Sequence, residues 1–294
     1  MNIIDAIMRL VENPVTDLKE YKIGSNRANN AGAALEEYVK DLFAGSFDLD
    51  DADRVKKLNE VFSYLGSNAS PPDAMLKGGD AIEVKKIESP GSALALNSSY
   101  PKHTLKQTST MITDACRKAE DWEEKDMLYI VGVVQKGTKN LKKVSMVYGL
   151  DYCASEECYL GLKNRIKEGV ESIQNVGFEE TAELGHINRV DPLGITYMRV
   201  RGMWGIDNPW KAFNYVFKTN NENGFEFMCI INEEKWKKLD NREKLNTINI
   251  QQGSFDIKDV EVKDPDNAAK LRRAKLITYI MTKEEVQKRK KKSK

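Results

Sequence analysis

Histidine and cysteine are scarce in this chain, which limits the metal and redox chemistry that it can carry. The 294 residues include two histidines and four cysteines, and the cysteines form no Cys-x-x-Cys pair. Zinc sites combine such ligands at short spacing, and disulfide scaffolds belong to small secreted chains. We therefore expect neither, and we interpret the thiols as buried or incidental. The residues concerned are His103, His186, Cys116, Cys153, Cys158 and Cys229.

Long apolar runs and an excess of one charge are also missing. No apolar segment approaches the roughly 20 residues of a membrane-spanning helix. Met1–Asp5 lacks the features of a signal or transit peptide, so we expect a cytoplasmic protein without a membrane partner. Lys and Arg number 46 against 45 for Asp and Glu. Any basic surface for a polyanion must therefore come from local clustering.

The stretch from Pro71 to Ile87 has the pattern of a β-hairpin. Ala74–Leu76 gives a short apolar strand, Gly78-Gly79 supplies a turn that tolerates positive φ, and Ala81–Ile87 alternates as a second strand. Asp80 stands between the turn and the second strand, where it either takes part in metal binding or closes the turn.

The second strand of this hairpin has a charged face. Because successive strand side chains point to opposite faces, Ile82 and Val84 share one face, and Glu83 and Lys85 share the other. Asp73, at the start of the first strand, can converge on the same point. Two carboxylates and an ammonium group at one point make a site for a hard divalent cation with a water molecule beside it. The alternative is a solvated hairpin with a charged outer face.

Glu-x-Lys alone is a weak signal in so charged a chain, and it needs further requirements. It also occurs at 123–125, 233–235 and 261–263. Only residues 72–85 add an upstream Pro-Asp and a Gly-Gly turn between two short strands. This combination resembles the signature of the PD-(D/E)XK nucleases. The resemblance implies that Asp73 and Glu83 hold Mg²⁺, and that Lys85 orients or activates the water that attacks a DNA phosphate.

The order of the predicted elements supports this resemblance. Apolar periodicity predicts, in order, a helix at 31–43, strands at 61–65, 74–76 and 81–87, a helix at 105–122, and strands at 127–135 and 143–150. Such an order is typical of the α/β sandwich of that superfamily. We predict an α/β fold with a mixed central sheet flanked by helices, and an α+β C-terminal half.

The helix at 31–43 supplies one more candidate metal ligand. In the nuclease superfamily a glutamate on the helix before the core sheet often reaches the metal site, sometimes through water. Glu36 is our candidate, because it follows Ala34-Leu35 in a Gly-x-Ala-Leu-Glu pattern. The alternative is a solvated surface position.

Two polar loops are candidates for contacts with DNA. Amide side chains and backbone N–H groups ahead of a helix can face phosphates or base edges. Short hydroxyl and amide side chains beside an active strand suit backbone and base contacts. Capping and ordinary surface loops are the alternatives. The candidates are Arg27, Asn29 and Asn30 in the first loop, and Asn97, Ser98, Ser99, Tyr100 and Lys102 in the second.

The C-terminal half lacks a second catalytic constellation, and its clearest signal is a pair of arginines. Arg199 and Arg201 alternate on a predicted strand and therefore point the same way. Arginine can donate bidentately to guanine O6 and N7 in the major groove. The alternative is a pair of exposed arginines held in salt bridges.

The remaining expectations for this half concern its elements and its end. We expect a helix at 160–174, strands at 215–218 and 225–231, and a turn at 220–224 between these strands. Residues 288–294 form a basic run, which we expect to be disordered and to add non-specific affinity for phosphate.

Taken together, several stretches resemble type II restriction endonucleases of the NgoPII type, nearly from end to end. The stretches are 25–32, 34–36, 72–73, 78–86, 96–102 and 199–204. The resemblance implies Mg²⁺-dependent cleavage of double-stranded DNA at GGCC, by one half of a restriction–modification pair whose methyltransferase acts on the same site. It also implies one restriction endonuclease domain over 1–294, with a catalytic core at about 25–150 and a recognition and dimerisation part at about 151–287.

A palindromic target implies a two-fold homodimer with one active site for each DNA strand. Two other functions remain open for this sequence. One is a DNA-repair type nuclease with less strict sequence choice. The other is a protein without catalysis, binding DNA or another ligand, in which the hairpin is structural.

Overall fold

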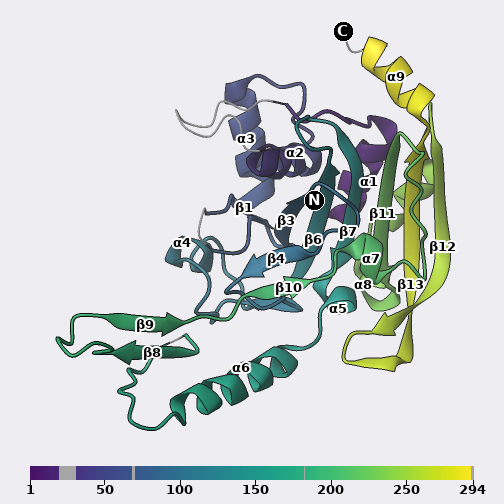
Figure 1. The fold of residues 1–294 in the computed structure, drawn as a ribbon. Helices are drawn as coiled ribbons and strands as arrows, with labels where there is room; N and C mark the ends of the chain where they lie inside the picture. Colours follow the sequence, from purple (N-terminus) through teal and green to yellow (C-terminus); the bar gives the residue numbers. More distant parts are fainter. Residues whose placement is uncertain (20–30, 68–69, 182, 293–294) are drawn as a thin grey trace.

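A mixed β-sheet runs through the centre of the computed structural model, which describes residues 1–19, 31–67, 70–181 and 183–292 (Figure 1). In the described residues its strands lie in the order β1-β2-β3-β6-β7-β11-β13-β12, and β5 pairs with β6. The strands are β1 (Phe62–Tyr64), β2 (Ala74–Leu76), β3 (Ala81–Ile87), β5 (Thr104–Lys106), β6 (Glu124–Val134), β7 (Leu141–Tyr148), β11 (Phe225–Asn232), β12 (Ser254–Asp264) and β13 (Asn267–Met281).

The pairing around β6 brings the predicted hairpin into the middle of the molecule. β2 and β3 are antiparallel, β3 is parallel to β6, and β6 is antiparallel to β7. β7 then runs parallel to β11. The strands β6, β7 and β11 are apolar along most of their length and buried on both faces, as expected of strands covered on both sides. The predicted mixed sheet flanked by helices is confirmed.

Three helices cover one face of the sheet. They are α1 (Ile3–Glu12), α2 (Ala31–Ala44) and α3 (Asp51–Val61). Asn2 begins α1 with a capping box, in which its side chain accepts from Ile4 N and Asp5 accepts from the Asn2 backbone. Leu35 on α2 packs in one apolar core with Ile82 and Val84 of β3. The predicted inward face of β3 is therefore confirmed.

The opposite face is covered mainly by the segment between β3 and β6, which forms a second apolar core. This segment holds β4 (Leu94–Asn97), β5 and the short helix α4 (Asp114–Arg117). The predicted helix at 105–122 is wrong. β5 finds an antiparallel partner at the start of β6, and Thr113 caps a helix that begins only at Asp114. The pairing of β5 with β6 outweighs the helical spacing of apolar residues in this segment.

An arm projects away from the sheet (Figure 1). It is built from α6 (Glu156–Glu171), β8 (Gly185–Asn188) and β9 (Tyr197–Val200), and β8 and β9 form an antiparallel pair. The following strand, β10 (Trp204–Ile206), returns to the body and pairs with β4. The helix expected at 160–174 is confirmed, with its start four residues earlier.

The last part of the chain differs from expectation in three places. The strand expected at 215–218 is wrong, because Val216 and Phe217 donate backbone hydrogen bonds to Phe213 O in a helical turn. The hairpin of β12 and β13 was not predicted. The tail is helical as far as Lys292, and Arg289 Nε anchors it by donating to Pro14 O at 2.9 Å. The turn before β11 is confirmed.

Short helices complete the fold. They are α5 (Gly149–Tyr152), α7 (Pro209–Ala212), α8 (Glu233–Lys238), a 3₁₀ helix, η1 (Arg242–Thr247), and α9 (Lys283–Lys292). Among the residues described, no helix has both the length and the apolar character needed to cross a membrane.

Candidate active site

The hairpin of β2 and β3 brings the two predicted acids to one point. Ala74 pairs with Ile82, so extending the register by one residue places Asp73 opposite Glu83. Asp73 N donates to Ile82 O at 2.9 Å, and Asp73 Oδ2 accepts from Val84 N at 2.7 Å. The backbone of β3 therefore fixes the carboxylate of Asp73.

Gly66 lies in the segment between β1 and β2, and its backbone packs closely against the backbone of Asp73. Gly66 has φ +90°, and a Cβ built on it would lie 2.4 Å from Asp73 O. Any side chain would have to displace the backbone of Asp73. The left-handed conformation at Gly66 is also one that only glycine adopts readily.

The predicted lysine completes the group. Lys85 Nζ lies 2.5 Å from Glu83 Oε1, whereas Glu83 Oε2 is buried and has no hydrogen-bond partner. A buried carboxylate oxygen without a partner is costly unless a cation or a ligand meets it. One half of Glu83 is therefore satisfied by the protein, and the other half is available to a ligand.

Burial makes both carboxylates difficult to ionise without a cation, and the charge of Asp73 adds to this effect at Glu83. Burial, followed by the neighbouring Asp73, raises the pKa of Glu83 to about 7. Burial also raises the pKa of Asp73, although Lys85 opposes it. Burial alone would lower the pKa of Lys85, but the charges of Glu83 and Asp73 outweigh it and raise that pKa. The lysine is held in its charged form, and the acids lack full compensation.

Glu36 lies close enough to Asp73 and Lys85 to interact electrostatically with both. Burial and then the charge of Asp73 raise its pKa, and Lys85 lowers it. Its neighbour Glu37 is used differently, because it pairs with Lys40 at 2.8 Å and with Arg54 at 2.6 Å. The structure therefore turns Glu36, and not Glu37, toward Asp73.

These residues suit a hydrated hard cation better than a fully enclosed metal. Within the described part of the chain, no group of three or more His, Cys, Asp or Glu side chains is placed to hold a metal ion. Asp73 and Glu83 offer two carboxylates, one with a free buried oxygen. Mg²⁺ usually keeps several waters and takes one or two carboxylates together with substrate phosphates. The two carboxylates of Asp73 and Glu83 match this coordination preference of Mg²⁺.

A cavity of about 210 Å³ opens in front of the acids. Asp73, Glu83 and Lys85 line it from the hairpin. The predicted second DNA-contact loop lines the opposite side, with Asn97, Ser98, Ser99, Tyr100 and Lys102. The sequence placed this loop only beside the active strand, and the structure brings the two groups around one cavity.

Lys102 is more deeply buried than a surface lysine that contacts a DNA phosphate would be. Its exposed fraction is 5%, and its ammonium lies 4.3 Å from the ring centre of Tyr100. Its backbone N–H donates to Tyr129 Oη at 2.7 Å. A Cβ on Gly149 would lie 2.3 Å from Lys102 O, so α5 leaves room for this backbone only because residue 149 is glycine.

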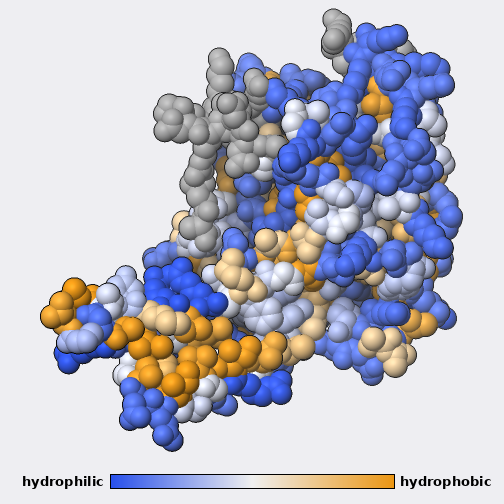
Figure 2. Space-filling view, viewed as in Figure 1, coloured by the Kyte–Doolittle hydropathy of each residue, from blue (hydrophilic) through white to orange (hydrophobic). Residues whose placement is uncertain are grey.

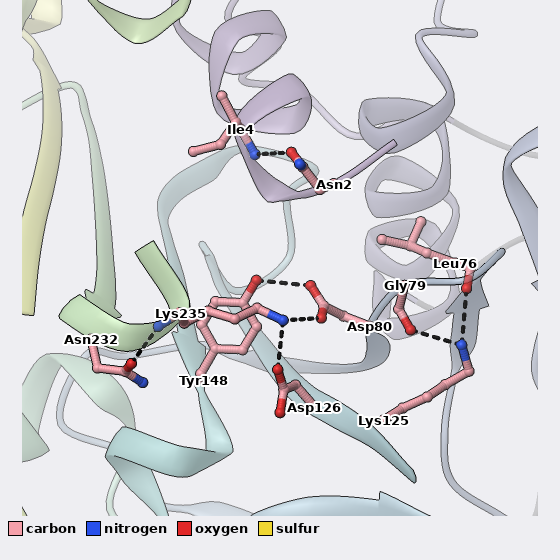
Figure 3. A network of polar contacts seen from close by, with 10 residues as sticks. All are labelled: Asn2, Ile4, Leu76, Gly79, Asp80, Lys125, Asp126, Tyr148, Asn232 and Lys235. Atoms are coloured by element: carbon pink, nitrogen blue, oxygen red, sulfur yellow. Dashed lines mark hydrogen bonds and ion pairs between the residues drawn. The ribbon is translucent and has the colours of Figure 1, made fainter. Parts of the chain in front are cut away.

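Asp80, whose role the sequence left open, belongs to a separate network (Figure 3). Tyr148 Oη donates to Asp80 Oδ2 at 2.8 Å, and Lys235 Nζ lies 2.6 Å from Asp80 Oδ1. The same ammonium lies 2.6 Å from Asp126, and Lys125 Nζ donates to Gly79 O at 2.7 Å. Both carboxylate oxygens of Asp80 are engaged by β7 and α8. Asp80 therefore closes the turn and ties the hairpin to the C-terminal half.

The predicted base-reading arginines lie on the arm. Glu183 holds both of them, with contacts of 2.7 and 2.6 Å to Arg199 and of 2.6 Å to Arg201. Both are about half exposed and held in salt bridges, as the alternative interpretation expected. Arg199 lies on β9, but Arg201 lies one residue beyond its end. The predicted Arg27, Asn29 and Asn30 lie outside the described residues.

Comparison with known proteins places this geometry in a family. The model of the NgoPII restriction endonuclease family matches residues 1–263. The chain belongs to the NgoPII restriction endonuclease family. It is 60% identical over 279 residues to the type II restriction enzyme NgoPII of Neisseria gonorrhoeae, which covers 95% of this chain and 99% of that relative. As a member of this family, the chain is a type II site-specific endonuclease. No solved structure matches it.

Sequence reasoning missed the residues that shape the site from outside the hairpin. Tyr129 is the parallel partner of Glu83 across β3 and β6, Gly149 is the first residue of α5, and Lys235 lies on α8. The apolar run at 127–135 predicted a strand, but no local signal gives the register between parallel strands that are far apart in sequence. Nothing in the sequence around Gly66 and Gly149 indicates that their backbones pack closely against Asp73 and Lys102.

Proposed function

We propose that this endonuclease hydrolyses phosphodiester bonds of double-stranded DNA in a Mg²⁺-dependent reaction, at the palindrome GGCC, as a homodimer. The single observation that carries the proposal is the buried pair of Asp73 and Glu83, which face each other across β2 and β3 with Lys85 at one Glu83 oxygen. The GGCC sequence rests on the family resemblance. We also propose that the sheet and its helices are a PD-(D/E)XK core.

Each residue of the pair has a defined role in this proposal. Asp73 and Glu83 hold Mg²⁺, and Glu36, which does not form a three-ligand group with them, supports it through water. The chemistry supplied by bound Mg²⁺ is polarisation of the scissile phosphate and stabilisation of charge on the leaving oxygen. Lys85, fixed by Glu83, holds the attacking water with an ammonium group that the two acids keep protonated.

DNA contacts are assigned to the surfaces around the cavity and on the arm. Asn97, Ser98, Ser99, Tyr100 and Lys102 line the cavity itself, so they contact the DNA nearest the cut. Arg199 and Arg201 read bases from the arm. The loop with Arg27, Asn29 and Asn30 is proposed for further contacts. The cognate methyltransferase acts on the same DNA site and need not bind this protein.

Plasmid cleavage tests the proposal. Plasmid DNA with mapped GGCC sites is incubated with the protein in Mg²⁺ or in EDTA, together with Asp73→Ala and Glu83→Ala variants. We expect discrete fragments from the wild type in Mg²⁺, and loss of cleavage in EDTA and in both variants, which stay folded. A smear would point to a less specific nuclease. Retention of more than roughly a tenth of the cleavage, far above the usual loss of a catalytic group, would mean that other carboxylates act.

A further inference from the structure

Two lysines from different elements lie near Glu83: Lys85 on β3 itself, and Lys102 in the loop after β4. Lys85 contacts Glu83 Oε1, and its other acidic neighbours are Asp73 and Glu36. Lys102 also acts on Glu83, but its other neighbours are Glu156 and Cys153. Asp73 stands beside Glu83 on the β2 side, whereas the backbone of Lys102 is bonded to Tyr129, the residue opposite Glu83 on β6, so Lys102 approaches Glu83 from the β6 side. Both side chains line the same cavity.

Lys102 is a buried cation that lacks an anionic partner. It is 5% exposed, and among the described residues no carboxylate lies within ion-pair distance of its ammonium. Its contact is the face of Tyr100, a weaker interaction than an ion pair. The bond to Tyr129 and the bare Cα of Gly149 hold its backbone in place. An unpaired ammonium at this depth is suited to a negative charge that arrives with a ligand.

An in-line displacement at phosphorus supplies such a charge on the side opposite the water. The attacking and leaving oxygens lie on opposite sides of the phosphorus atom. In the proposed function Lys85 serves the water from β3, and Lys102 reaches the same cavity from the β6 side, where its ammonium is available to the leaving oxygen. We propose that Lys102 is a second catalytic residue, whose ammonium donates a hydrogen bond to the leaving oxygen as negative charge develops on it. This inference rests on the proposed function.

The reaction then balances without any further reagent. The bond from the water oxygen to phosphorus forms while the bond from phosphorus to the leaving oxygen breaks. The water gives its proton to solvent on the Lys85 side. The leaving oxygen, stabilised by the Lys102 ammonium, takes a proton from solvent after the bond has broken. Lys102 stays charged throughout and is not consumed.

The test compares two leaving atoms in single-turnover cleavage. Analysis of the product ends first shows which bridging oxygen leaves, and a second GGCC duplex carries sulfur at that position. Lys102→Met keeps the length of the side chain and removes its charge. We expect it to cleave the oxygen substrate ~100-fold more slowly, the scale of one lost donor to a developing charge. Because a thiolate leaves without help, the loss on the sulfur substrate should shrink to about tenfold or less.

Matched variants separate this role from others. Lys85→Met should lose its rate equally on both substrates, because it serves the water. Lys106→Met removes an exposed lysine that pairs with Glu156, and it should change neither rate. DNA affinity in EDTA should differ by less than about threefold between Lys102→Met and wild type, since the charge is used in the transition state.

The outcomes are distinguishable. An equal loss for Lys102→Met on both substrates, or a loss explained by weaker DNA binding, overturns the inference. Where Lys102→Met fails to fold, Lys102→Arg replaces it; the retained charge should keep most of the oxygen-substrate rate, and a full loss that sulfur does not relieve overturns the inference. A wild type that cuts neither substrate contradicts the proposed function itself.

Discussion

At the scale of single residues, Glu83 links protonation to stability and to metal binding. Its folded pKa of about 7 lies above its ordinary value of 4.5 because of burial and of Asp73. Between these two pH values the folded chain holds more protons than the unfolded chain, so the free energy of unfolding decreases as pH rises. The carboxylate form, to which we assign Mg²⁺ in the proposed function, predominates only above about pH 7.

Glu83→Gln should remove this dependence. In EDTA, the wild-type melting temperature should fall from pH 5 to pH 8 by several degrees more than that of the variant, since one pKa unit is worth about 1.4 kcal/mol. Mg²⁺ should stabilise the wild type more at pH 8 than at pH 5. Thermal melts followed by circular dichroism measure both effects. Parallel curves for the two proteins would show that Glu83 is not the group responsible.

At the scale of elements, the turn between β2 and β3 depends on α8. Asp80 and Lys235 are both largely buried, and Lys235 also pairs with Asp126. Removing one partner of a buried ion pair leaves the other charge without compensation. The hairpin that carries the acids is therefore held from a helix more than 140 residues further along the chain.

Lys235→Met should lower the free energy of unfolding by about 3–5 kcal/mol. Urea unfolding measures this loss. Lys237→Met is the control, because Lys237 forms an exposed pair with Glu233 on the same helix and should change stability by less than about 1 kcal/mol. The double variant Asp80→Asn with Lys235→Met should be more stable than Lys235→Met alone; an equal or larger loss would place the effect outside this pair.

At the scale of elements, local patterns in the sequence predicted some helices and strands correctly and others not. The hairpin at 71–87 and the helix α2 were predicted because their periodicity and turns are local. The helix expected at 105–122 failed because β5 pairs with β6, and the β12–β13 hairpin was missed because its exposed strands alternate irregularly. The candidate acids and Lys85 could be found from spacing. The position of Lys102 near Glu83, and the partners of Asp80, depend on long-range packing.

At the scale of the whole molecule, the arm exposes an unusual amount of apolar surface (Figure 2). On the loop between β8 and β9, Leu193 is 80% exposed and Ile195 is 76% exposed. Such a surface marks an interaction site. A two-fold dimer on a palindrome requires a self-complementary surface outside the active site. We infer that the arm supplies it in the proposed homodimer.

Leu193→Ser combined with Ile195→Ser should therefore shift the protein from dimer to monomer. Sedimentation velocity over a range of concentrations measures this shift. The exposed Val55 to Ser, on α3, is the matched control and should leave the dimer intact. A double variant that sediments like the wild type would exclude the loop between β8 and β9 from the dimer interface.

The arm also carries the arginines proposed to read bases. Replacing the arginine that contacts guanine by alanine, at Arg199 or Arg201, should cost about 1–3 kcal/mol of discrimination at one base pair. Affinities for GGCC and its single-base variants across a salt series measure this cost. A uniform loss of affinity for all sequences, with a salt slope lower by about one, would identify a phosphate contact in its place.

The pairing of β4 with β10 connects the arm, which carries the proposed base-reading arginines, to the loop that ends at Lys102 in the proposed active site. Trp204, three residues after Arg201, pairs with Asn97, which begins the loop that ends at Lys102. Its ring also packs on Tyr100, with centroids 6.4 Å apart. A rotation of the arm on meeting its target cannot leave this loop unmoved, because the two strands share hydrogen bonds. In the proposed function, base recognition by the arm and cleavage are therefore coupled through β4 and β10. We expect a wrong sequence that does not bind the arm correctly to leave Lys102 misaligned with the scissile bond as well.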